Sequence, residues 1–111
     1  MSVRQNVTVI VERDRPAHGQ FATEPYECGW AAEAIFFIRK LQAGDQLVGL
    51  QLRVQISPDG IRWSDEGARL TFSEGEVDFV RAAHFGNWLR LAGGLPDEAD
   101  SRVLVALSLK E

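Results

Sequence analysis

The sequence has little of several residue types, and each scarcity excludes a class of protein. Cys28 is the only cysteine among 111 residues, which excludes an internal disulfide and is typical of a reducing compartment. The longest apolar runs, residues 7–11 and 34–38, are far shorter than a membrane span. The first residues lack the apolar stretch of a signal peptide. We therefore expect cytoplasmic synthesis without a signal peptide and no membrane partner.

Lysine is also scarce, since Lys40 and Lys110 are the only lysines among 12 basic residues. The net charge is −4, and no basic cluster is longer than Arg39-Lys40. A nucleic-acid partner is not expected, because such proteins need a basic surface that displaces counterions from phosphates. Arginine is enriched and lysine depleted at protein interfaces, so the arginine bias indicates subunit contacts. A GC-rich genome would produce the same bias.

The hydrophobic content of 45% and charged content of 25% are those of an ordinary globular domain. The chain contains no linker, internal repeat or low-complexity segment. Residues 1–111 are therefore expected to form a single domain.

The clearest pattern lies between Leu50 and Trp63. Apolar residues alternate there with Gln51, Arg53 and Gln55, which predicts a strand with one buried face. The turn residues 57–60 (SPDG) follow, and the alternation then resumes. A four-residue loop would place Ile56 opposite Ile61 and Val54 opposite Trp63, with Trp63 in the core.

The N-terminal part combines a strand with a long irregular segment. Residues 3–11 are rich in β-branched side chains, which predicts a strand buried on much of both sides. Residues 13–29 contain two prolines and two glycines and read as a loop. Long loops of this kind are often functional or lie against a partner. Phe21, Tyr26 and Trp30 are the expected anchors of this segment, and Trp30 is assigned to the core.

Residues 30–41 fit two structures. Trp30, Ala34, Phe37, Ile38 and Leu41 have helical spacing, whereas alternation within residues 32–38 gives a strand. Residues 35–38 (IFFI) are good β-formers, and residues 43–46 read as a turn leading into the next strand. We favour the strand because every neighbouring segment also reads as β. One short helix near residues 30–41 remains the alternative.

The second half continues as short strands between turns. Turns are expected at residues 65–67 and 73–76, followed by Val77 and Phe79 pointing inward. Further on, Leu89 and Leu91 should point inward, with Trp88 and Arg90 outward. An alternating strand over 103–109 closes the chain. Strands at about ten-residue spacing predict an all-β protein, a single antiparallel β-sandwich of jelly-roll type.

The second half also resembles a known group of domains. The hairpin Ser57-Pro58-Asp59-Gly60-Ile61-Arg62-Trp63, the strand residues 87–91 and the closing strand 103–109 are similar to the discoidin and wider galactose-binding-like jelly-roll group. A similar hairpin occurs in small β-sandwich proteins of phage particles. The resemblance covers residues 48–109 and implies a fold. The chain lacks the terminal cysteine pair and the ligand-binding spikes of discoidin domains, so no binding residue is transferred.

No catalytic or metal constellation stands out. His18, Cys28 and His84 have neither the local signature of a nucleophilic site nor the spacing of zinc ligands. The acidic residues Asp97, Glu98 and Asp100, with Ser101, lack the spacing of a calcium loop. The carboxylates Asp65, Glu66, Glu74 and Glu76 lie in expected turns at hairpin ends rather than as a pair across a cleft. We therefore expect no enzyme activity, no cofactor and no metal.

Polar and aromatic residues on the outward side of the central strands form the predicted binding surface. These residues are Gln51, Arg53, Gln55, Arg62, Trp88 and Arg90. Tryptophan and arginine are typical of protein–protein hot spots, and planar amides with an indole also suit sugars. The sequence predicts an interaction or assembly module, most simply a self-associating structural or accessory protein of a virion or shell. The alternative is a carbohydrate-binding module, with a glycan as the partner.

Overall fold

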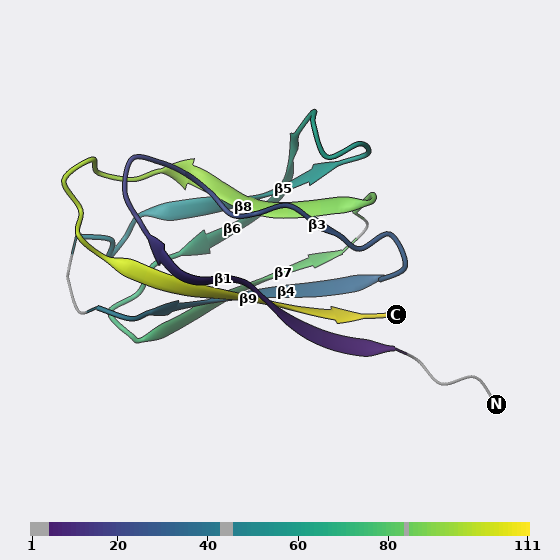
Figure 1. Ribbon diagram of the computed structural model, residues 1–111, viewed down its shortest axis with the longest axis horizontal. Helices are drawn as coiled ribbons and strands as arrows, with labels where there is room; N and C mark the ends of the chain where they lie inside the picture. Colours follow the sequence, from purple (N-terminus) through teal and green to yellow (C-terminus); the bar gives the residue numbers. More distant parts are fainter. Residues whose placement is uncertain (1–4, 43–45, 84) are drawn as a thin grey trace.

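The computed structural model describes residues 5–42, 46–83 and 85–111, which form two antiparallel sheets packed face to face (Figure 1). The turn 43–45 and His84, both considered above, lie outside the described residues. The strands are β1 (Asn6–Pro16), β2 (Gln20–Ala22), β3 (Tyr26–Glu27), β4 (Glu33–Lys40), β5 (Gln51–Ser57), β6 (Ser64–Thr71), β7 (Val77–Ala83), β8 (Trp88–Gly94) and β9 (Arg102–Lys110). The described residues contain no helix, and the all-β prediction is confirmed.

Sheet A has the strand order β1-β9-β4-β7, and sheet B has the order β2-β8-β5-β6, with β3 also paired to β8. Sheet A is the lower layer and sheet B the upper layer in Figure 1. The pairs are nested: β5 pairs with β6, β4 with β7, β2 and β3 with β8, and β1 with β9. The chain is therefore one long folded-over hairpin divided between two sheets, which is the jelly-roll arrangement.

The core lies between the sheets and is formed by alternate residues of their strands. β9 alternates strictly: Val103, Val105, Leu107 and Leu109 are buried and the residues between them are partly exposed. Residues 33–40 form a strand, as favoured above, because Phe36 and Ile38 enter the core from β4. The main core side chains of sheet B are Leu52, Val54, Leu89 and Leu91.

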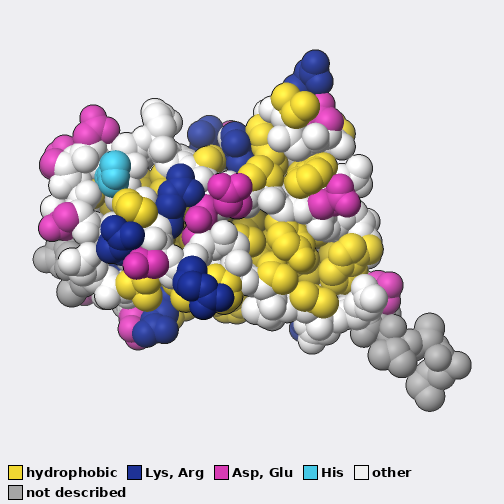
Figure 2. Space-filling view, in the orientation of Figure 1, with side chains coloured by type: hydrophobic (Ala, Val, Ile, Leu, Met, Phe, Trp, Pro, Cys, Tyr) yellow, Lys and Arg dark blue, Asp and Glu magenta, His cyan; other side chains and the backbone are white. Residues whose placement is uncertain are grey.

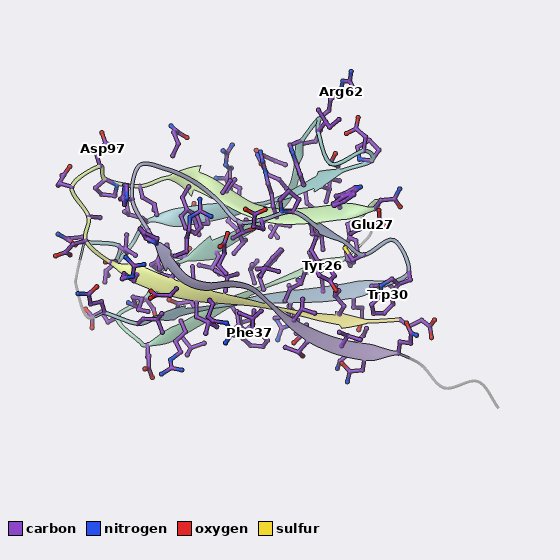
Figure 3. All side chains as sticks on the ribbon, in the orientation of Figure 1. Tyr26, Glu27, Trp30, Phe37, Arg62 and Asp97 are labelled. Carbon is purple, nitrogen blue, oxygen red and sulfur yellow. The ribbon has the colours of Figure 1, made fainter. Side chains whose placement is uncertain are left out.

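The loop predicted at residues 13–29 is wrong in part, because residues 13–16 belong to β1 and the segment then forms β2 and β3, which pair with the edge of β8. Thr23 bridges the gap between β2 and β3, since its backbone N–H donates to the Leu91 carbonyl and its hydroxyl accepts from the Leu91 N–H. Phe21 anchors the segment in the core and Tyr26 is half-buried. Trp30 is 40% exposed, so its assignment to the core was wrong. Trp30, labelled in Figure 3, lies toward the right-hand end of the sandwich, and Figure 2 shows an apolar patch on that side of the molecule.

The predicted register of the SPDG hairpin was wrong. Ile56 pairs with Ser64 rather than with Ile61, and the connection comprises residues 58–63. Ile61 is 76% exposed. The sequence pattern suggested a tight loop, but Asp59 organises a wider one whose tip projects from the sandwich (Figure 1).

The predictions for β6 and β7 were also wrong, because the pairing between strands determines which residues of a strand face the core. The turn expected at residues 65–67 is a bulge within β6, where Gly67 has a φ of 121° and the register with β5 shifts. In β7, Val80 and Ala82 face the core, whereas Val77 and Phe79 are 49% and 51% exposed. A one-residue change of phase turns every side chain of a strand to the opposite face.

β1 also differs from expectation. It is an edge strand of sheet A, and most of its residues are exposed rather than buried on both sides. Its register with β9 shifts between Ile10 and Arg15. Such irregularity at a sheet edge disfavours uncontrolled pairing with other strands.

Candidate functional site

Gln55 is the centre of the polar surface on the outer face of sheet B. In the register, β6 places Asp65 on one side of Gln55 and β8 places Arg90 on the other. The Gln55 amide donates to Asp65 Oδ1 at 3.0 Å, and its carbonyl oxygen accepts from Arg90 Nε at 2.8 Å. Gln55 was expected to be exposed but is buried, because its neighbours cover it. Both ends of its amide are used internally.

Trp63 supplies the indole of this surface, and Arg90 lies over it. The guanidinium carbon of Arg90 is 4.2 Å from the centroid of the Trp63 ring, a cation–π contact worth on the order of 1 kcal/mol. Partial burial lowers the pKa of Arg90 below its usual value, and the nearby Arg53 lowers it further. The aromatic residue that joins the polar group is thus Trp63, which the sequence placed in the core.

Arg53 and Arg69 extend the surface toward the edge strand β6. They are directly paired across β5 and β6, and Arg53 contacts Asp65 Oδ2 at 3.3 Å. The pKa of Asp65 is lowered, first by the hydrogen bond from Gln55 and then by Arg53 and Arg69. Asp65 therefore remains ionised through the neutral range and balances part of the arginine charge.

Gln51 and Thr71 form the next row along the same two strands. They are register partners, and the Gln51 amide donates to the Thr71 hydroxyl at 3.0 Å. Both residues are exposed. They place neutral hydrogen-bonding groups beside the charged row formed by Arg53 and Arg69.

Trp88 lies under the projecting loop rather than on an open surface. A Cβ on Gly60, which has a φ of 79°, would be 3.2 Å from the Trp88 ring. Glycine is favoured there because it adopts positive φ without steric cost and allows the loop to rest on the indole. Trp88 therefore supports the loop, and its ring is not an open stacking platform.

Arg62 stands apart from the other predicted residues, at the loop tip labelled in Figure 3. Its side chain is 84% exposed and pairs with Asp59 at 2.8 Å. Asp59 Oδ1 accepts the backbone N–H groups of Ile61 and Arg62, and these bonds lower the pKa of Asp59 to about 2. The loop is thus held in shape by one carboxylate.

Only some of the six predicted binding residues lie together in one site. The structure brings Gln51, Arg53, Gln55 and Arg90 together on one face, with Trp88 beside them under the loop and Arg62 projecting away. Sequence reasoning missed Trp63, Asp65 and Arg69. The charged residues of segment 62–69 (RWSDEGAR) indicated a polar surface near the hairpin. The bulge at Gly67 interrupts the alternation, so the sequence does not show which of these residues face outward.

A second surface, on the outer face of sheet A, was not predicted. Ile10, Ala106, Phe37 and Phe79 are successive register partners across the four strands. They form an apolar row across the whole sheet, and Phe37, labelled in Figure 3, projects from the lower side. The Phe37 and Phe79 ring centroids are 6.1 Å apart. Ile10 is 43% exposed, so the row is open to water as well as apolar.

The other candidate residues do not assemble into a reactive site. Cys28 is buried, and burial together with the neighbouring Glu27 raises the pKa of its thiol to about 11. The thiol is therefore protonated and a poor nucleophile at neutral pH. His18 is exposed. In the described ranges, no three or more His, Cys, Asp or Glu side chains are grouped to hold a metal ion, including the acidic residues 97–100. The same ranges contain no helix able to span a membrane.

The fold and the two outer faces define a small jelly-roll β-sandwich domain with an apolar row on the outer face of sheet A and a hydrogen-bonded polar network around Gln55 on the outer face of sheet B. A family model described as "Domain of unknown function (DUF6385)" matches residues 43–106, from the start of the β5 region into β9. The chain belongs to this family. No curated protein matches the sequence.

Proposed function

We propose that this protein is a non-enzymatic assembly module that associates with a second copy through the outer face of sheet A. The observation that carries the proposal is the apolar row Ile10, Ala106, Phe37 and Phe79, whose two ends, Ile10 and Phe79, are exposed and whose middle residues are half-buried. Large side chains exposed together in this way are a cost to an isolated soluble domain and commonly mark an interface. In this proposal the protein is a structural or accessory component of a larger particle, such as a virion or shell.

The boundary of the apolar row fits a protein interface. Arg39 and Glu76 form an ion pair at 3.4 Å near the β4–β7 edge. The Arg81 guanidinium lies 5.1 Å from the centroid of the Phe79 ring. An apolar centre with arginine and ion pairs at its rim is the usual anatomy of such a surface. Arg39 and Arg81 also belong to the arginine excess that indicated subunit contacts in the sequence.

The size of sheet A is adequate for a stable contact. Four strands about 4.8 Å apart and about 26 Å long give roughly 500 Å² of flat area, and protruding side chains increase the accessible area further. A standard interface covers about 800 Å² on each partner. Two copies related by a two-fold axis would each present the same apolar row, which is the arrangement of an isologous dimer.

Size-exclusion chromatography with light scattering tests the proposal. We expect an oligomer at tens of micromolar, and we expect Phe79→Ser to shift it to the 12.4 kDa monomer. Ile61→Ser is the matched control, because Ile61 is even more exposed but lies on the projecting loop. A wild-type protein that is monomeric at this concentration contradicts the proposal. Equal effects of the two substitutions would place the interface elsewhere.

A further inference from the structure

One part of the outer face of sheet B, around Arg53 and Arg69, carries more positive than negative charge. Arg53 and Arg69 lie near the carboxylate of Asp65, and Arg90 is joined to it only through Gln55. Asp65 contacts Arg53 directly, whereas Arg69 forms no ion pair within residues 5–42, 46–83 and 85–111. Dark blue side chains project from the upper margin of Figure 2, above this sheet. This excess of positive charge is local, since the whole chain has a net charge of −4.

The arrangement of these arginines is unfavourable in the protein without a ligand, because their charges repel. Arg53 and Arg69 are directly opposed across two strands, and like charges at such positions destabilise a sheet. Arg53 also lowers the pKa of Arg90, which is a second sign of repulsion between the guanidinium groups. A bound anion would remove both costs. The carboxylate that partly balances the cluster, Asp65, already has its oxygens occupied by Gln55 and Arg53.

The neighbouring row indicates what kind of anion fits. Gln51 and Thr71 are exposed and lie one row beyond Arg53 and Arg69 on the same face. The two rows are about 6.8 Å apart, because alternate residues of a strand share a face. One row therefore offers guanidinium groups, which pair with carboxylates in a planar, two-bonded geometry. The other offers an amide and a hydroxyl, which are suited to sugar hydroxyl groups.

We propose that this surface binds acidic saccharides, with Arg53 and Arg69 holding a uronate carboxylate and Gln51 and Thr71 contacting the ring hydroxyls. Arg90 covers Trp63 and the projecting loop covers Trp88. Recognition thus depends on charge and hydrogen bonds rather than on aromatic stacking, which selects against neutral sugars. This proposal specifies the ligand of the carbohydrate-binding alternative: the glycan would be an acidic saccharide. It lies on the opposite sheet from the proposed self-association surface and does not depend on it.

The test is a titration of ¹⁵N-labelled protein with tetragalacturonate, followed by NMR. The amide and side-chain signals of Gln51, Arg53, Arg69 and Thr71 should shift. Arg69→Gln should weaken binding by about tenfold, the usual loss for one charge-assisted hydrogen bond to a carboxylate. The matched control is Arg13→Gln, which makes the same charge change at an exposed position on β1, in the other sheet. It should leave affinity unchanged.

Two further probes separate an acidic saccharide from other ligands. A neutral galactose tetramer should bind much more weakly than tetragalacturonate, because it lacks the carboxylates. Polyglutamate should also bind more weakly, because it lacks the ring hydroxyls. The proposal is overturned if tetragalacturonate causes no shifts at millimolar concentration, or if Arg13→Gln weakens binding as much as Arg69→Gln. Equal binding of polyglutamate would instead assign the site to acidic peptides and overturn it as well.

Discussion

The two outer faces of the sandwich differ in how far their side chains are covered by one another. Each sheet buries one face in a common core, and each has to present the other face to water. Sheet B covers its centre with side-chain contacts: Gln55 is buried between Asp65 and Arg90, and Arg90 lies on Trp63. Sheet A leaves Phe79 and Ile10 exposed, with the half-buried Phe37 between them in the row. The first face has its side chains bonded to one another within the monomer, whereas the second leaves apolar side chains open to water.

This difference predicts a large contrast between two aromatic substitutions. Trp63→Ala should lower the free energy of unfolding by about 2 kcal/mol, because it removes a half-buried ring and uncovers Gln55. Phe79→Ala should cost about 0.5 kcal/mol in the monomer, since half of its surface is already exposed. Urea denaturation at a concentration where the protein is monomeric measures both. Equal losses would remove the distinction between a covered and an open face.

A substitution in the projecting loop beside sheet B should have an intermediate effect on stability. Gly60→Ala should lower the free energy of unfolding by about 1 kcal/mol or more, because alanine is strained at positive φ. Its Cβ would also be 3.2 Å from the Trp88 ring. Gly49→Ala is a control with a similar φ of 85° and no atom within 4 Å of the added Cβ. If the two variants are equally stable, contact with Trp88 contributes nothing and the loop does not rest on it.

The smallest expected effects concern pH and fall on the sheet B side. The pKa values of Asp59 and Asp65 are lowered in the folded protein, that of Asp59 to about 2. Because the folded values lie below the unfolded value near 3.8, the stabilisation is fully present above about pH 4. It should be lost as the pH falls toward 2.

Asp59→Asn and Asp65→Asn should each make the stability less dependent on pH between about 5 and 2. Denaturant titrations across this range measure the effect, and Glu74→Asn provides a control at an exposed turn residue. An unchanged pH dependence in the two aspartate variants would mean that these carboxylates do not stabilise the folded loop and face.

Local sequence pattern determined much of the scaffold. Alternation in residues 103–109 and the β-branched and aromatic residues of 33–40 predicted strands that the structure confirms. The outward assignment of Arg53 and Arg90 was also correct, because period-two alternation is a local property of an extended chain. The turn chemistry at Ser57, Asp59 and Gly60 identified the right place for the chain to reverse.

The sequence by itself predicted the all-β class and the reversal at the SPDG hairpin, and it favoured a strand over a helix at 33–40, because these depend on neighbouring residues. Only the tertiary structure decided the phase of β7, the bulge at Gly67 and the position of Trp63, because strand pairing sets each of them. The apolar row of sheet A has the same origin: its four residues come from β1, β4, β7 and β9 and meet only when the nested hairpin closes. Contacts between residues distant in sequence produce no local sequence pattern from which they can be predicted.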